Sequence, residues 1–441
     1  MNKLLKSIAL LLSLFITGKS AVAQSTWSLT QCINYAYENN LQLQQQKLNI
    51  DKSQNNILSS KLGLLPAVNA SMSHNMNWGR SVNLQDLEIV ENKLSQSTSA
   101  SLSASLSIFE GFSKLNTIKN DKTQLEISAQ QVEKLKNDLS ISITRAYLQV
   151  LLAQEIEKTA RASYKSVEEQ VTRTKKLVDA GSQAYSTLLE IQAQLATEQV
   201  QLVTAQNSVR TNLLTLTQLL DIPTDTNFAI VTPDINNLFT PFNPNNITSI
   251  YHSALNLPEI KTSELSLESS KLALKIQKGA ALPKISLSAG YGTYYSDGQE
   301  QAFFTQFNNN KNPSLGFGLS VPIFNGWRSN TSIRNARIDV KNSEIELKKI
   351  HQTLYKEIQQ AYNDAISFYE KYKAAEQNMK SSAESFSYTE QKFSLGMLNG
   401  TDYTVAKTNL FKSQSEYYQT KFQYIFQLKI LDFYKGIPIT L

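Results

Sequence analysis

The chain has 441 residues, of which 41% are hydrophobic and 18% are charged, and its formal net charge is +6. This length allows several domains or one elongated domain. The basic residues are scattered among acidic ones, which is typical of a solvated surface and argues against a nucleic-acid-binding protein. A single cysteine excludes an intramolecular disulfide framework.

The N-terminus has the pattern of a secretory signal peptide over residues 1–23. Two lysines precede an apolar run, and a small-residue cleavage site ends at Ala23. Because Cys32 lies inside the mature chain and not at the cleavage point, no N-terminal lipid anchor is expected. No later segment has about 20 consecutive apolar residues, so no transmembrane helix is predicted.

The two halves of the chain carry the same motifs in the same order, which indicates an internal duplication. Two copies are too few for a solenoid, which needs at least three repeats. The first repeat spans 24–223 and the second spans 250–441, and a proline-rich connector at 224–249 joins them. The matching motifs are Leu65-Pro66 with Leu282-Pro283, Ile108-Phe109-x-Gly111 with Ile323-Phe324-x-Gly326, and Ile222-Pro223 with Ile437-Pro438.

Each repeat contains two long stretches without glycine or proline, separated by a turn that holds Gly181 in the first repeat and Gly396 in the second. Apolar or small residues recur in them at three-four spacing, which is typical of a coiled coil. Such lengths are abnormal for a helix of a globular domain. They predict one helical hairpin over 112–222 and another over 328–435.

A helix and then two strands are predicted before each hairpin, because apolar residues alternate there with small ones. All odd positions from Ser97 to Ser107 are serine, and the even positions between them are mostly alanine or leucine. Each strand therefore has an apolar face and a face of small, uncharged residues. The predicted strands span about 67–77, 97–109, 284–295 and 313–324.

The ends of these strands are marked by proline, glycine and aromatic residues. Pro66 and Pro283 lie where an incoming helix must end and a strand begin. Where a strand turns into the long helix, glycine permits a tight bend, and the aromatic residues either anchor at a bilayer interface or simply pack at the turn. The residues at this second junction are Phe109, Gly111, Phe324 and Gly326.

A soluble β-sandwich would also show alternation, but its outer face would carry lysine and glutamate, and a second sheet would be needed to cover the apolar face. A membrane barrel explains both faces, since lipid covers one and water fills the lumen. About eight strands are needed to close even a small barrel, and open edges do not occur in lipid. The sequence therefore predicts a mixed α+β membrane protein whose barrel is shared between subunits.

Catalysis has little support in the sequence. His74, His252 and His351 are the only histidines and lack metal-ligand spacing. No P-loop and no nucleophile elbow is found. We expect neither an enzyme nor a bound cofactor or metal.

From about Leu29 to Pro438, the order, spacing and duplication of these motifs resemble the TolC-type outer-membrane efflux proteins. The loop that begins at Asn77-Trp78-Gly79 is similar to the first external loop of members from Bacteroidetes. The resemblance implies a homotrimer with a 12-stranded β-barrel in the outer membrane, four strands coming from each subunit. It also implies a long periplasmic α-helical coiled-coil barrel, with the connector 224–249 in an equatorial region.

The resemblance also implies the function of this chain, which would be a passive duct for efflux or type I secretion. Its members dock their hairpin tips onto a periplasmic adaptor, which joins them to an inner-membrane pump of the RND or ABC type. Each tip residue is equally well explained without a docking role, as part of a turn in which a glycine ends the helix. The matching tip residues here are Ala180, Gly181, Ser182, Leu395, Gly396 and Met397.

The family also narrows its tunnel at the periplasmic end with acidic residues, and Asp402 occupies one matching position. A second acidic position is Val405 here and a basic position is Leu398, so the ionic lock is only partly present. Alternatively, Thr401 or Asp402 caps a helix N-terminus. In the first repeat, Thr187 and Glu190 have the spacing of a capping box.

A second function remains open from the residues alone. An exported coiled-coil scaffold or adhesin, whose strands form a soluble cap, would have the same helices but no channel. The cargo is not predicted, since selection takes place at the pump.

Overall fold

The computed structural model describes residues 26–82, 89–223, 228–233 and 246–441. The predicted signal peptide, 1–23, lies outside these residues, as do parts of the predicted connector. The described chain divides into two units, and both repeats contribute to each. The helical unit comprises the chain up to Gln45 with 134–256 and 352–441, and the sheet unit comprises 46–133 and 257–351.

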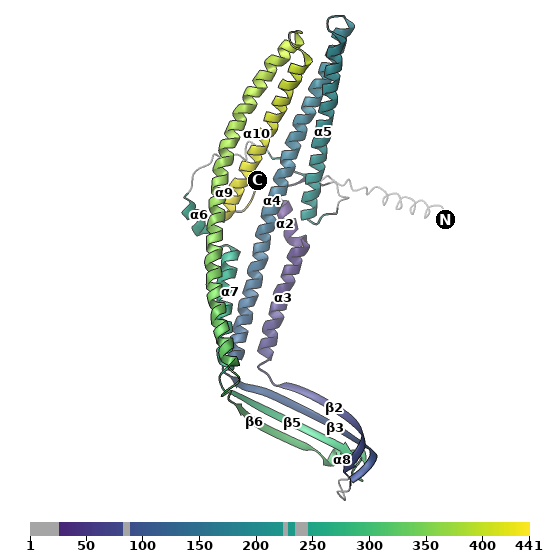
Figure 1. The fold of residues 1–441 in the computed structure, drawn as a ribbon, viewed down its shortest axis with the longest axis vertical. Helices are drawn as coiled ribbons and strands as arrows, with labels where there is room; N and C mark the ends of the chain where they lie inside the picture. Colours follow the sequence, from purple (N-terminus) through teal and green to yellow (C-terminus); the bar gives the residue numbers. More distant parts are fainter. Residues whose placement is uncertain (1–25, 83–88, 224–227, 234–245) are drawn as a thin grey trace, which may run out of the picture. The chain divides into compact units, whose positions relative to one another are not determined.

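Two helical hairpins dominate the helical unit (Figure 1). α4 and α9 have 67 residues each and also extend into the sheet unit, while α5 and α10 have 35 residues each. At 1.5 Å per residue, the longer helices measure about 100 Å. The equal lengths reflect the duplication in the sequence. The bounds are α4 Ser113–Asp179, α5 Tyr185–Leu219, α9 Arg328–Ser394 and α10 Gly400–Tyr434.

One hydrophobic core of the helical unit surrounds α2 (Leu29–Asn39). Cys32 is fully buried there, and burial raises the pKa of its thiol to about 12. Tyr147 of α4 donates a hydrogen bond of 2.7 Å to the carbonyl of Val231, next to the short parallel pair of β1 (Thr26–Trp27) and β4 (Ala229–Ile230). The buried members of this core come from α2, α4, α5, β4 and α10, together with Leu220 just after α5.

Part of the predicted connector is therefore packed against the helices. Ile230 is buried in this core. Asn246 caps α6 (Ile247–Ala254), because its side chain accepts a hydrogen bond from the backbone N–H of Thr248 at 2.9 Å.

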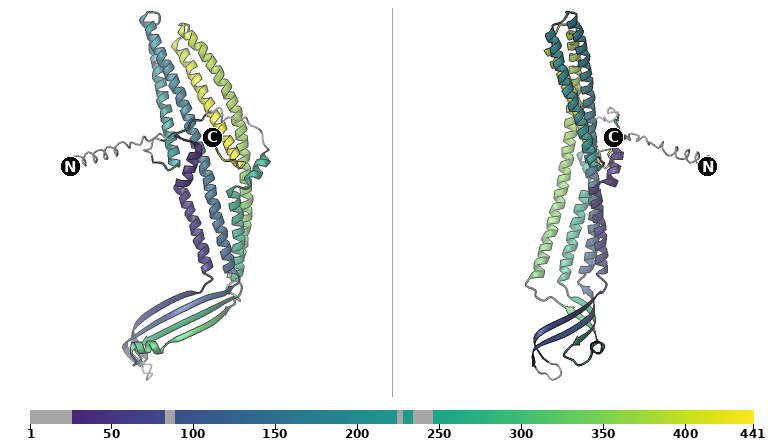
Figure 2. Two further views of the ribbon diagram at one scale, coloured as in Figure 1. Left: turned by 180° about the vertical axis from the view of Figure 1, so that it is seen from behind. Right: turned by 90° about the vertical axis from the view of Figure 1, so that its right-hand side faces the viewer.

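The sheet unit holds a four-stranded antiparallel sheet in the order β2-β3-β5-β6. Figure 2 shows that its strands are curved. α7 (Pro258–Ala280), most of α3 (Leu41–Leu62) and the first parts of α4 and α9 complete the unit, together with the short helix α8 (Phe303–Asn309). The strands are β2 Ala67–Val82, β3 Ile89–Glu110, β5 Lys284–Ser296 and β6 Asn312–Ser320.

The sheet register places small residues opposite one another on one face. The hydroxyl groups of Ser71 and Ser101 are 2.8 Å apart, as are those of Ser73 and Ser99. Between β5 and β6 a serine lies opposite a glycine, for example Ser286 opposite Gly318, and a Cβ at that glycine would stand 2.8 Å from the serine hydroxyl. Small residues on this face therefore also fit its close packing.

Large apolar side chains cover the other face and are exposed. They come from all four strands, and a water-facing sheet would leave this area uncovered. The most exposed members are Val68, Met72, Trp78, Leu315, Phe317 and Leu319.

Three strand predictions need correction. β6 ends at Ser320 and not at 324, because Pro322 lacks the N–H that a ladder hydrogen bond requires. β2 and β3 are longer than the predicted 67–77 and 97–109, because their backbone pairing continues beyond the alternating residues as far as Val82 and Ile89. Among the described helices, none is both long and apolar enough to cross a membrane.

Candidate functional site at the hairpin ends and the strand junctions

The two hairpin ends have the same turn geometry. Gly181 and Gly396 both have φ of +75°, a conformation that favours glycine. In each turn the glycine N–H donates to the carbonyl three residues earlier, at 2.9 and 3.0 Å. The N–H of the next residue, Ser182 or Met397, donates to the carbonyl five residues earlier, at 2.8 and 2.9 Å. These bonds satisfy the last carbonyls of α4 and α9, so both long helices end in the same glycine cap.

The predicted tip residues all lie in these two turns and are exposed. The tips differ in chemistry, since the second presents the large apolar side chains of Leu395 and Met397. The predicted residues of the first tip, Ala180 and Ser182 beside its glycine, are small, and Tyr185 at the start of α5 is exposed next to them. An apolar partner surface would therefore gain more from the second tip.

α10 begins with a cap that the sequence did not single out. The side chain of Asn399 accepts a hydrogen bond of 2.8 Å from the backbone N–H of Asp402. Asn399 is therefore the N-cap, and the prediction that Thr401 or Asp402 caps this helix is wrong. Asp402 lies in the first turn with its side chain exposed, where a carboxylate is favoured by the helix dipole.

Glu190 joins α5 to α10. Its carboxylate accepts a hydrogen bond of 3.1 Å from the backbone N–H of Gly400. Gly400 is buried, and a Cβ at this position would collide with the Glu190 carboxylate. The predicted capping box of Thr187 and Glu190 is wrong, because α5 already begins at Tyr185 and has no side-chain cap.

Farther from the tips, the helical unit buries two opposite charges. Glu198 of α5 is 1% exposed and Lys407 of α10 is 6% exposed. Gln194 donates to the Glu198 carboxylate at 2.7 Å. Burial lowers the pKa of Lys407, and the negative charges of Glu198 and Glu390 oppose this shift. A buried charge is costly unless it is paired, so these groups depend on one another.

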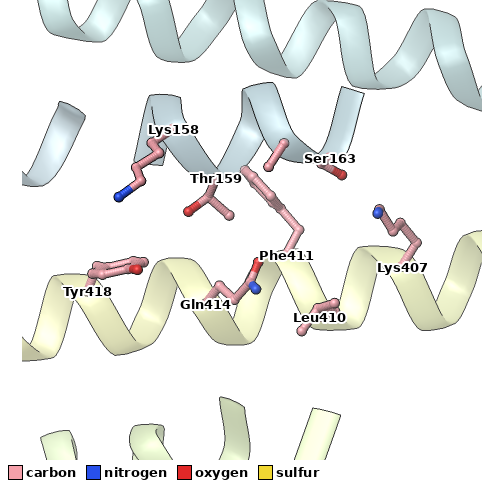
Figure 3. A pocket seen from close by; sticks show the side chains of 9 residues that line it. Lys158, Thr159, Ser163, Lys407, Leu410, Phe411, Gln414 and Tyr418 are labelled. Carbon is pink, nitrogen blue, oxygen red and sulfur yellow. The ribbon is translucent and has the colours of Figure 1, made fainter. Parts of the chain in front are cut away.

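The surroundings of Lys407 combine an aromatic contact with loose packing. Its ammonium nitrogen lies 4.8 Å from the ring centroid of Phe386 on α9. A cavity of about 270 Å³ separates α4 from α10, and Figure 3 shows Lys158, Thr159 and Ser163 of α4 across it from Lys407 and its neighbours. A cavity of this size leaves the contact between α4 and α10 incompletely packed.

The strand–helix junctions are two copies of one turn. Gly111 and Phe112 have φ of +59° and +63°, and Gly326 and Trp327 have φ of +65° and +66°. A Cβ at Gly111 would collide with the carbonyl of Gly279 near the end of α7. At Gly326 nothing lies within 4 Å of such a Cβ among the described residues. The first turn is thus packed within the chain, whereas the second is open.

The remaining junction residues lie where the sequence predicts them. Pro66 directly precedes β2 and Pro283 directly precedes β5, just after α3 and α7 end. The rings of Phe109 and Phe112 make an edge-to-face contact at 5.2 Å, and Phe324 is largely exposed. In the described part of the chain, no three His, Cys, Asp or Glu side chains are grouped so that they could hold a metal ion.

Comparison with known proteins agrees with this architecture. AprF, the alkaline protease secretion protein of Pseudomonas aeruginosa, is 24% identical over 383 residues, which cover 86% of this chain and 78% of that protein. The outer membrane protein TolC of Vibrio cholerae is 22% identical over 429 residues, covering 94% and 92%. A crystal structure of CusC superimposes with a TM-score of 0.78 at 17% identity, over 95% of this chain and 96% of CusC.

The family described as "Outer membrane efflux protein" matches residues 32–221 and 250–434. These two segments agree with the two repeats of the sequence and include both hairpins and all four long strands. The match covers well over half of the chain, and the chain therefore belongs to the outer membrane efflux protein family.

Proposed function

We propose that three copies of this chain form an exit duct, in which each contributes its four-stranded sheet to one barrel in the outer membrane. The observation that carries this proposal is a sheet with two edge strands, β2 and β6, and one face of large exposed apolar side chains. Open sheet edges are not stable in hydrocarbon, so β6 of one copy must pair with β2 of the next.

The internal repeat supplies the register of this pairing. Within the chain, β3 pairs with β5 so that Ser103 is opposite Gly290. By the repeat, β3 corresponds to β6 and β5 corresponds to β2. Transferring the register places Gly318 opposite Ser73 of the partner subunit. The same register keeps the apolar residues of both strands on one face, as lipid requires.

Disulfide trapping tests the proposal. In a Cys32→Ala background, Ser73→Cys with Gly318→Cys should yield a covalent trimer on oxidation, because facing Cα atoms of paired strands lie about 5.5 Å apart, within disulfide range. Asn77→Cys with Gly318→Cys is the control. Its cysteines lie on the same face but about 13 Å apart along the strand, too far for a disulfide.

The function itself is tested by membrane behaviour. The protein should be extracted only with detergent, should form a heat-sensitive oligomer and should conduct ions in a planar bilayer. A water-soluble monomer without conductance would refute the duct and would favour the scaffold or adhesin.

The proposed mechanism is passive. The inner face of the sheet carries serine and glycine, so the barrel would offer no strong binding site and would let varied solutes pass. The energy would come from an inner-membrane pump of the RND or ABC type, reached through a periplasmic adaptor. We propose that the adaptor docks at the two hairpin ends, with Leu395 and Met397 as its main apolar contacts.

Opening of the periplasmic end would require the hairpins to move apart. The contact of Glu190 with Gly400 ties α5 to α10 and must break if those two helices separate. Asp402 lies on the first turn of α10 and is our candidate for the acidic aperture.

We further propose that the signal peptide 1–23 is cleaved and that the mature chain has no N-terminal lipid anchor.

A further inference from the structure

The short helix α8, between β5 and β6, packs on the apolar face of the sheet. The ring of Phe303 lies 4.9 Å from that of Tyr295, and the Thr293 hydroxyl donates to the carbonyl of Phe307 at 2.6 Å. Thr293 and Tyr295 alternate along β5 on the same face as Tyr291. α8 therefore lies on the apolar side of the sheet and not on the small-residue side. Figure 1 shows this helix at the end of the strands.

A buried amide fixes the position of α8. Gln306 is fully buried, and its side-chain oxygen accepts the N–H of Ser296 at 3.0 Å. Its amide nitrogen donates to the carbonyls of Ser296 at 3.0 Å and Gln301 at 2.7 Å. Because Gln306 is buried, the loss of one of these hydrogen bonds would leave a polar group unsatisfied, at a cost in free energy. The bonds therefore hold α8 against β5.

The strands under α8 carry polar residues on the face that is otherwise apolar. His74 and Thr98 are hydrogen-bonded to each other at 2.8 Å, and Thr98 is 4% exposed. Thr293 is bonded to α8 itself. The hydroxyl groups of Thr98 and Thr293 thus each have a partner within the protein, as a lipid-facing surface requires, while His74 is exposed beside them.

The level of α8 along the strands matches the outer boundary of a bilayer. β5 begins at Lys284, and a strand crosses the hydrocarbon in about 9–11 residues. Thr293 and Tyr295 lie about this number of residues after Lys284, where the strand would leave the hydrocarbon. Trp78 of β2 and Tyr295 of β5 lie equally far from the first residues of their strands, and aromatic side chains at this level are typical of the interfacial girdles of membrane barrels.

α8 has one aromatic side and one polar side. Phe303, Phe304 and Phe307 lie on one side, and Thr305, Asn308 and Asn309 lie on the other. Phe304 is 83% exposed. Beside α8, a shallow groove of about 460 Å³ includes Thr293, and its lining is mainly apolar, with Met72, Leu102 and Tyr291.

We infer that α8 and this groove form a lipid-binding site in the outer leaflet, where Phe304 inserts among the acyl chains and one chain occupies the groove. This inference rests on the proposed function, because the apolar face must already lie in the membrane. The polar side of α8 faces water, as in interfacial amphipathic helices.

Spin labelling in phosphatidylcholine vesicles tests the inference. In a Cys32→Ala background, nitroxide labels are placed at Phe304→Cys, at the neighbouring control Thr305→Cys and at Leu315→Cys on the apolar face of β6. The label at 304 should collide with oxygen in preference to a water-soluble nickel complex, with a ratio several-fold higher than that at 305 and similar to that at 315.

The possible outcomes separate the two proposals. A water-exposed label at 304 with a lipid-exposed label at 315 would overturn the lipid site and leave the barrel intact. A water-exposed label at 315 would overturn the barrel itself. A second measurement uses Phe304→Trp, which keeps an aromatic side chain. Its added fluorescence should be quenched by phosphatidylcholine brominated near the headgroup, and unchanged fluorescence would contradict the inference.

Discussion

Asp402 has the exposure that a pore-facing group needs. Asn399 already caps α10, so the carboxylate of Asp402 is not required to bind a backbone N–H at this terminus. Its side chain is exposed, whereas Tyr403, the next residue, is fully buried and burial raises its pKa to about 12. Tyr403 thus contributes to the packing of the helices, whereas Asp402 carries an exposed charge.

We expect Asp402→Ala to weaken the block of ion currents by Mg²⁺ in planar bilayers, because the proposed trimer would lose three carboxylates from its proposed aperture. Asn399→Ala is the control. It should lower stability by about 0.5–2 kcal/mol through the lost cap but leave the block in place. If the block were unchanged in Asp402→Ala, the residue would have no role at the aperture.

The two helical hairpins have helices of the same lengths and the same glycine caps. They differ in the contacts at the N-terminus of the second helix, α5 in the first hairpin and α10 in the second. α10 begins with Asn399 as a cap and receives the Glu190 carboxylate from α5. α5 begins after Ala184 without a side-chain cap. The duplication therefore fixes the shape of the hairpins, while single substitutions decide how one hairpin holds the other.

Glu190→Ala should favour the open state of the duct, since it removes a hydrogen bond to a charged group worth about 1.5–3 kcal/mol. The measurement is single-channel recording, with a larger open probability or conductance as the expected result. Glu384→Ala, at an exposed carboxylate of α9, is the matched control and should behave like the original chain. Identical currents in both variants would show that Glu190 does not restrain the hairpins.

At the scale of the whole molecule, the fold and the family agree with the predicted exit duct. The chain is an outer-membrane efflux channel with a periplasmic extension, a transporter and not an enzyme, which confirms the prediction. The scaffold or adhesin therefore loses its support. The likeness to members from Bacteroidetes stays a prediction.

The two faces of the sheet should respond oppositely to the same charge. Phe317→Arg, on the apolar face, should reduce stability in the membrane by about 2–4 kcal/mol and lower the yield of trimer. Ser101→Arg, on the small-residue face, should leave the trimer intact and shift the reversal potential in a salt gradient towards anion selectivity. If Ser101→Arg prevented assembly while Phe317→Arg did not, the two faces would have been assigned the wrong way round.

Much of this fold could be predicted because its signals are local. The alternation from Ser97 to Ser107, the prolines before β2 and β5 and the glycines at 181 and 396 each act within a few residues. α8 was missed because seven residues are too few to show helical periodicity, and the helix is held by the contacts of Gln306.

The sequence by itself determined the duplication, the two faces of every strand and the positions of the turns, since these follow from side-chain period and backbone restriction. Only the tertiary structure decided that Glu190 contacts Gly400, that Lys407 and Glu198 are buried and that α8 packs against one end of the apolar face. The first two join residues about 210 positions apart, and the third depends on the path of a loop. No local pattern encodes such contacts, because they exist only once the helices and strands have packed.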